Sequence, residues 1–162
     1  MKKSLVTLAF CCITCLVPWT LRAKGRTLRV VIEGANLRAP VQIAGAPILD
    51  DFNVWAGPGT STNEPDGFII RWAQGATAEP SKGLPRYQVS FYTDDRKGPS
   101  YVVYYCYDPS TKSGYVYLPG RADKWYRVNM GSIARGIEGN WFRARASWDS
   151  AAEPLILRAQ NN

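Results

Sequence analysis

Tyrosine side chains give this chain its clearest capacity to bind a ligand. All nine tyrosines lie between Tyr87 and Tyr126, and each offers a ring for stacking and a hydroxyl for hydrogen bonding. Residues 100–107 and 115–118 have the composition of strands, in which side chains alternate between two faces. If the face richer in aliphatic residues packs in the core, the other face carries a stripe of tyrosines, namely Tyr101, Tyr105, Tyr107, Tyr115 and Tyr117.

Such a stripe has a functional and a structural interpretation, and the sequence leaves both open. Exposed rings could stack on sugar rings or on bases, with roughly 1–3 kcal/mol for each stacked base. Trp55 lies beside Gly57-Pro58-Gly59 and could present its indole at a loop tip. The same side chains could instead be core residues, or cross-strand pairs that only stabilise a sheet. As ligand-binding candidates we take Trp55 and the five tyrosines.

Composition excludes several classes of catalytic and metal site. The chain has no histidine, which excludes Ser-His-Asp triads, Cys-His pairs and zinc sites that contain histidine. Of its four cysteines, only Cys106 lies beyond the N-terminal apolar segment. A single cysteine cannot form a disulfide or an iron–sulfur site within the chain, and we expect it to be buried. We therefore predict no catalytic residue, no metal site and no cofactor.

Carboxylates are the remaining route to catalysis, because pairs of them can act as general acid and base. The acidic candidates for such a pair are Glu33, Asp50, Asp51, Glu64, Asp66, Glu79, Asp94 and Asp95. Adjacent aspartates in turns are commonly solvated turn formers. A hydrolase without histidine is thus the second hypothesis. It requires a cleft with two carboxylates roughly 5–10 Å apart, one with a raised pKa.

Three partial motifs lack an essential component. Residues 57–60 are rich in glycine but do not end in the Gly-Lys-Ser/Thr of a phosphate loop. Residues 108–112 begin like a calcium loop, but Lys112 stands where an oxygen ligand belongs. Arg121, Lys124 and Arg127 are interleaved with aromatic residues, as in nucleic-acid binders, and a solvated strand face accounts for them equally well. We expect no nucleic-acid partner.

The N-terminus has the pattern of a secretory signal peptide. Lys2 and Lys3 precede an apolar run over residues 5–19, and Leu21-Arg22-Ala23 offers a cleavage site. The run is shorter than the roughly 20 residues needed to span a membrane, and its cysteines do not follow the small residue that lipidation requires. We expect cleavage near Ala23, no membrane span in the mature chain, and a periplasmic or secreted location. Loss of residues 1–23 removes three of the 20 basic residues and none of the 13 acids, so the net charge falls from +7 to +4.

The remaining residues, 24–162, predict a single β-rich domain. Alternating or β-branched stretches between Gly, Pro and Asp turns predict strands, at residues 27–33, 37–43, 68–73, 86–93, 100–107, 115–118, 124–128, 141–146 and 155–157. Residues 46–52 predict one helical turn, and residues 147–153 predict a short helix that Pro154 ends. We expect a mainly β fold, a single antiparallel β-sandwich or partly closed barrel with one or two short helices.

Three segments resemble those of small exported bacterial proteins of unknown function. They are residues 32–43 (IEGANLRAPVQI), 52–59 (FNVWAGPG) and 115–120 (YVYLPG). The resemblance covers most of the chain after residue 23, and its motifs are structural in character. It implies a bacterial, extracytoplasmic protein and transfers no activity and no site residue.

Taken together, these features favour a non-catalytic binding module of the bacterial envelope. Its expected ligand is carbohydrate or cell-wall material, bound on an aromatic face of the sheet. A third hypothesis is an envelope protein that binds a protein partner by adding a strand at residues 37–43. Pro40 cannot donate to a sheet ladder, so this stretch is expected at an edge.

Overall fold

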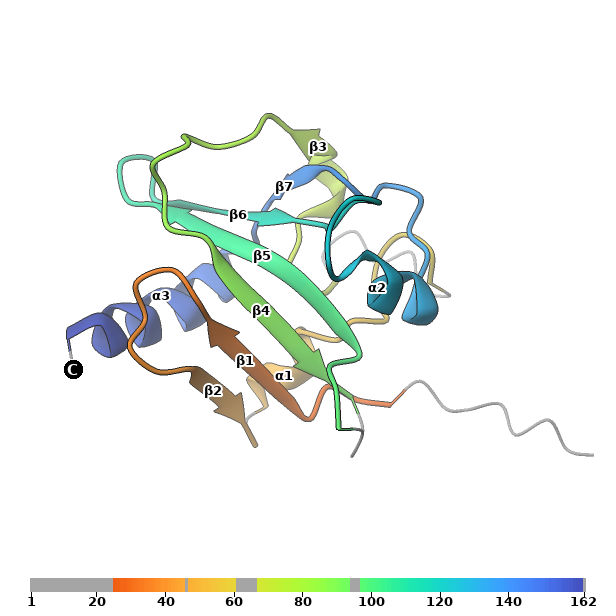
Figure 1. The fold of residues 1–162 in the computed structure, drawn as a ribbon, viewed down its shortest axis with the longest axis horizontal. Helices are drawn as coiled ribbons and strands as arrows, with labels where there is room; N and C mark the ends of the chain where they lie inside the picture. Colours follow the sequence, from red (N-terminus) through yellow and green to blue (C-terminus); the bar gives the residue numbers. More distant parts are fainter. Residues whose placement is uncertain (1–24, 46, 61–66, 94–96, 162) are drawn as a thin grey trace, which may run out of the picture.

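One antiparallel sheet of seven strands forms the centre of the molecule (Figure 1). The computed structural model describes residues 25–45, 47–60, 67–93 and 97–161. The strand order is β2-β1-β4-β5-β6-β7-β3, and the sheet is not closed into a barrel. The strands are β1 (Arg29–Glu33), β2 (Val41–Ala44), β3 (Ala76–Thr77), β4 (Tyr87–Tyr92), β5 (Tyr101–Asp108), β6 (Ser113–Tyr117) and β7 (Trp141–Arg143). The predicted mainly β, antiparallel fold is confirmed, with one sheet in place of two stacked sheets.

The predicted signal peptide and its cleavage site lie outside the described residues, as do Glu64, Asp66, Asp94 and Asp95. The predicted edge position is confirmed for the stretch that contains Pro40. Strand β2 begins directly after Pro40 and is the outermost strand of the sheet, paired with β1.

Helices and loops supply the layer that covers one face of the sheet. The helical segments are α1 (Ile48–Asp51), the 3-10 turn η1 (Trp72–Gln74), α2 (Tyr126–Ser132) and α3 (Ala146–Asn161). Figure 1 shows α1 and α3 behind the sheet. Antiparallel sheets commonly bury one face and leave the other solvated. We call the side that α1 and α3 cover the inner face, and the opposite side the outer face.

Helix α3 contradicts the prediction that Pro154 ends the helix and that residues 155–157 form a strand. It continues through Pro154 to Asn161. Trp148, Ala152 and Ile156 are spaced four residues apart and are all buried, so they form one apolar stripe on the sheet. Burial of large side chains such as Trp148 and Ile156, at roughly 1.5–3 kcal/mol each, offsets the cost of about 3 kcal/mol for a proline inside a helix.

The strand predicted at residues 124–128 is also wrong, because helix α2 begins at Tyr126. Asn129 of this helix is fully buried. Its side-chain amide accepts from the Val102 backbone N–H (2.8 Å) and donates to the Val102 carbonyl (2.7 Å). Val102 lies beyond the last residue of β5 that pairs with β6. The Asn129 side chain thus supplies the hydrogen bonds that the Val102 backbone would otherwise need from a neighbouring strand.

The core lies between the inner face and this covering layer, and it is rich in aromatic rings. Trp148 packs edge-to-face on Phe52 and Tyr105, with ring centroids 5.1 and 5.7 Å apart. Phe68 lies 4.8 Å from Phe91 in the same layer. The aliphatic residues of the sheet that complete this core, all fully buried, are Val30, Ile32, Val89, Val103 and Val116.

The buried side chain of Arg135 holds the loop after α1 against the core. The Arg135 guanidinium donates to the carbonyl oxygens of Val54, Ala56 (3.0 Å) and Pro58 (2.9 Å), and its Nε donates to the Tyr101 hydroxyl (3.1 Å). It also lies about 5 Å from three aromatic ring centroids, those of Phe68, Trp72 and Tyr101. These contacts compensate the loss of water around the charge.

Candidate functional site

The predicted stripe of five tyrosines does not exist as one surface. Across β5 and β6 the register pairs Tyr105 with Val116 and Tyr104 with Tyr117. Since directly opposed residues share a face, Tyr105 and Tyr117 lie on opposite faces of the sheet. Tyr101, Tyr105 and Tyr107 therefore belong to the inner face, and Tyr115 and Tyr117 to the outer face.

Tyr101 and Tyr105 are core residues, each with no exposed surface. The Tyr105 hydroxyl donates to Oδ1 of Asp149 (2.9 Å). Burial, followed by the nearby Asp149 carboxylate, raises the pKa of Tyr105 far above its usual value. These two rings cannot stack on a ligand, which corrects the prediction for them. The assumption that failed is that the more aliphatic face must be the core, because Trp148 and Phe52 cover the Tyr105 side of the sheet.

Trp55 and Tyr107 are only half buried, but neither belongs to a common aromatic surface. The Trp55 indole packs against the core, and its N–H donates to the Gly25 carbonyl (2.8 Å). Tyr107 lies on the inner face at the border of a pocket. The structure thus separates these two candidates from each other and from Tyr115 and Tyr117.

A row of three rings, Tyr104, Tyr117 and Trp141, lies on the outer face, and we call it the outer row. The Tyr104 and Tyr117 rings are 6.4 Å apart at an interplanar angle of 31°, and Tyr117 and Trp141 are 5.1 Å apart at 39°. Tyr104 and Tyr117 are half exposed, whereas Trp141 is 7 % exposed and supports them from the side. Sequence reasoning missed Tyr104 because it assigned that side of residues 100–107 to the core, and it missed Trp141 because it assigned no face to the strand predicted at residues 141–146.

Polar groups held in fixed positions border the outer row. The Tyr117 hydroxyl donates to Oδ2 of Asp123 (2.9 Å). Gln88, the cross-strand partner of Tyr104, accepts from the Trp125 indole N–H (2.7 Å) and donates to the Glu33 carboxylate. These contacts fix an amide, two carboxylates and a phenol beside the rings. The amide N–H groups of Gln88 and the O–H of Tyr117 donate within the protein, so these groups offer a ligand mainly acceptor oxygens.

Basic side chains cover some of the neighbouring rings. Arg86 lies 5.0 Å above the Trp141 ring, Lys124 lies 4.5 Å above Trp125, and Arg143 lies 4.3 Å above Tyr115. Such cation–π contacts occupy the ring faces. Tyr104 and Tyr117 are the two rings of the outer face for which no such cover is seen among the described residues, and they are therefore the best placed to meet a ligand.

Cys106 packs with Tyr115 and Trp141 in a small buried cluster on the outer face. It is fully buried, which confirms the expectation from the sequence, and burial raises the pKa of its thiol to about 12. Because the thiolate is the reactive species, this cysteine is an inert packing residue.

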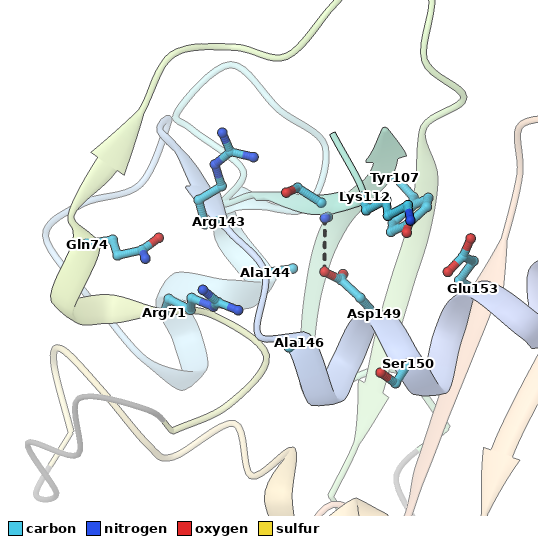
Figure 2. Close-up of a pocket in the computed structure, with 12 residues that line it drawn as sticks. Arg71, Gln74, Tyr107, Lys112, Arg143, Ala144, Ala146, Asp149, Ser150 and Glu153 are labelled. Atoms are coloured by element: carbon cyan, nitrogen blue, oxygen red, sulfur yellow. Dashed lines mark hydrogen bonds between the residues drawn. The ribbon is translucent and has the colours of Figure 1, made fainter. Parts of the chain in front are cut away.

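The second candidate feature is a pocket of about 400 Å³ on the inner side, between α3 and η1 (Figure 2). Asp149 lies at its centre, and its Oδ2 accepts from the Gly114 backbone N–H (3.0 Å). A Cβ at Gly114 would lie 1.9 Å from Oδ1 of Asp149, so the close approach requires glycine. Burial raises the pKa of Asp149, against the opposing effects of the Gly114 and Tyr105 hydrogen bonds and of Arg71.

Of the carboxylates predicted for a hydrolase, the four that lie among the described residues, Glu33, Asp50, Asp51 and Glu79, do not line this pocket. Asp50 pairs with Arg26, Glu79 pairs with Arg86, and Glu33 accepts from Gln88. The pocket instead holds Asp149 and Glu153, four residues apart on α3. The predicted helix at residues 147–153 already placed this pair on one helical face, which was the available signal for them. Among the described residues, no cluster of three or more Cys, Asp or Glu side chains could hold a metal ion.

No protein-family model, curated protein or solved structure matches this chain. The resemblance to small exported bacterial proteins therefore stays a prediction. Among the described helices, none combines the length and the apolar character that crossing a membrane would require.

Proposed function

We propose that this chain is a non-catalytic binding module that recognises carbohydrate through the outer row. The observation that carries the proposal is the pair of half-exposed rings, Tyr104 and Tyr117, side by side on the outer face. Tyrosine combines an apolar ring with a polar hydroxyl, and a sugar likewise combines apolar C–H faces with hydroxyl groups. Stacking and hydrogen bonding can then occur in one contact.

The polar border of the outer row supports a sugar rather than a purely apolar ligand. Asp123 holds the Tyr117 hydroxyl, and Gln88 is held between Trp125 and Glu33. Carboxylate and amide oxygens in fixed positions can accept hydrogen bonds from sugar hydroxyls. Because these side chains are already ordered by protein contacts, a ligand loses less affinity to side-chain ordering.

The proposal includes export, with the signal peptide over residues 1–23 removed near Ala23. An envelope or extracellular location would bring the outer row into contact with polysaccharides. Intact-mass measurement of protein recovered from a bacterial periplasm tests this part. A mass that still includes residues 1–23 would contradict it.

Co-sedimentation is the direct test of the binding function. The purified protein is mixed with insoluble peptidoglycan and with several insoluble polysaccharides over a salt series. Binding that persists at about 0.5 M salt, where charges are screened beyond a few ångströms, supports stacking on the outer row. Binding lost at that salt concentration indicates only a screened net charge.

Capture of a protein partner is the competing proposal, and β2 is the feature that favours it. This strand is at the edge of the sheet, and its second edge pairs with no described strand. An open edge can accept a further strand. Failure to bind any of the polysaccharides would remove the carbohydrate proposal and place capture at β2 first.

A further inference from the structure

The pocket between α3 and η1 carries opposite charges on its two sides. Arg71 enters from the segment that precedes η1, and Asp149 and Glu153 enter from α3 (Figure 2). The ion pairs of the described residues are Arg26–Asp50 and Arg86–Glu79. No carboxylate oxygen of the described residues therefore lies within 4.0 Å of the Arg71 guanidinium. Arg71 is still close enough for its charge to oppose the rise in the pKa of Asp149. The pocket keeps the two charges apart.

The acidic side is preorganised by the protein. Tyr105 and Gly114 each donate to a different oxygen of Asp149, which fixes the carboxylate and leaves further lone pairs for a ligand. Glu153 lies one helical turn further along α3 and interacts with the Tyr107 hydroxyl. Residues four apart on a helix have Cβ atoms roughly 5–6 Å apart, so one ammonium group can reach both carboxylates.

The basic side is provided by Arg71 rather than by the other cations nearby. Arg143 also borders the pocket, but its guanidinium lies over the Tyr115 ring on the outer face, and Figure 2 shows it directed away from Asp149. Lys112 is exposed at the rim. Arg71 is half buried, and a guanidinium can bind a carboxylate through two parallel hydrogen bonds.

We propose that this pocket binds a small zwitterion, a free α-amino acid, with its carboxylate on Arg71 and its ammonium on Asp149 and Glu153. A ligand with a single charge would leave one side of the pocket without a counter-charge, whereas a zwitterion compensates both. The volume of about 400 Å³ falls in the range of small-molecule sites. This site is independent of the outer row, so either proposal can fail without the other.

Isothermal titration calorimetry with the purified full chain tests the proposal. The common L-amino acids are titrated first. The best of them is then compared with its N-acetyl derivative, which lacks the ammonium, and with its amide, which lacks the carboxylate. We expect saturable binding of at least one amino acid and at least tenfold weaker binding of both derivatives. Absence of saturable binding, or equal binding of the derivatives, would overturn the proposal.

Two variants test which pocket side chain binds the carboxylate of the ligand and which binds its ammonium group. Arg71→Met should weaken binding of the parent amino acid at least tenfold and cause no further loss for its amide. Glu153→Gln should weaken the parent similarly and cause no further loss for the N-acetyl derivative. Arg158→Met, an exposed arginine on the same helix, is the matched control and should bind like the wild type. Equal losses for the parent and both derivatives in each variant would contradict the assigned orientation.

Discussion

Replacement of Tyr104 by alanine should weaken carbohydrate binding and leave the domain folded. The ring is half exposed and lies 6.4 Å from Tyr117, so a stacked sugar would contact both. A nucleic-acid base stacked on one aromatic side chain gains roughly 1–3 kcal/mol. A sugar contact of the same size would, when lost, raise Kd about 5- to 150-fold. Tyr117→Ala should have an effect of similar size. Tyr104→Phe keeps the ring and should retain most of the affinity.

The cost in stability should be smaller than for a core ring. Complete removal of a buried aromatic side chain costs about 3–5 kcal/mol, and Tyr104 is only partly buried, so we expect about 1–2 kcal/mol. Urea unfolding followed by tryptophan fluorescence measures this cost. The same samples are then titrated with soluble fragments of whichever polysaccharide binds in co-sedimentation.

Tyr92→Ala is the matched control. Tyr92 is also a half-exposed tyrosine on the outer face, beneath Arg29 at 4.0 Å. Tyr92 is the last residue of β4, four residues after Gln88, the cross-strand partner of Tyr104. Four residues correspond to roughly 13 Å along a strand. The reasoning is refuted if folded Tyr104→Ala and Tyr117→Ala bind as tightly as the wild type, or if Tyr92→Ala weakens binding as much as they do.

Three further predictions concern the buried polar groups. Arg135→Met should destabilise the fold by about 3–5 kcal/mol, because its removal leaves several buried oxygens without a donor, at about 1–3 kcal/mol for each. The exposed Arg127→Met should change the urea midpoint little, and equal effects of the two substitutions would contradict this role of Arg135. Cys106, with its pKa raised to about 12, should resist iodoacetamide at a pH of about 8 to 9 in the native protein and should react once the protein is unfolded in urea. Peptide mass spectrometry locates the label. Rapid labelling of the native protein at Cys106 would contradict its burial. Asp149 has a pKa raised by burial, so the stability it contributes is complete below its unfolded pKa and is lost as the pH rises through the native value. Asp149→Asn should therefore flatten the acidic part of the stability-versus-pH profile, and a profile parallel to that of the wild type would show that the raised pKa is absent.

Local pattern was sufficient to predict the central strands. Residues 86–93, 100–107 and 115–118 were expected as strands and correspond to β4, β5 and β6. Their β-branched and aromatic composition, with turns between them, depends only on neighbours in sequence. The burial of Cys106 and the edge position of the stretch after Pro40 were predicted for equally local reasons, namely side-chain polarity and a missing N–H.

The choice of face could not be made locally, because it depends on what covers the sheet. Period two separates Tyr104 from Tyr105 but does not say which of them meets the core. That choice was made by Trp148 and Phe52, which supply an aromatic layer on the Tyr105 side. The outer row formed for the same reason, since Tyr104 and Tyr117 were left on the opposite side.

Helix boundaries show the same limit. Pro154 is a helix breaker by its own chemistry, yet α3 continues past it because Trp148 and Ile156 are buried on one stripe. Residues 124–128 form no complete strand, because helix α2 begins at Tyr126 and places the buried Asn129 amide where it satisfies the backbone of β5. In both cases a long-range contact outweighs a local preference.

The amino-acid sequence by itself determined that the domain is mainly β and antiparallel, that it has no histidine chemistry, and that most of its tyrosines lie on the central strands. These properties depend on residue type and on spacing along the chain. The tertiary structure decided which tyrosines are exposed, and it brought Arg71 to one side of a pocket with Asp149 and Glu153 on the other. Those juxtapositions join residues about 80 positions apart, through strand register and helix packing that no local pattern encodes.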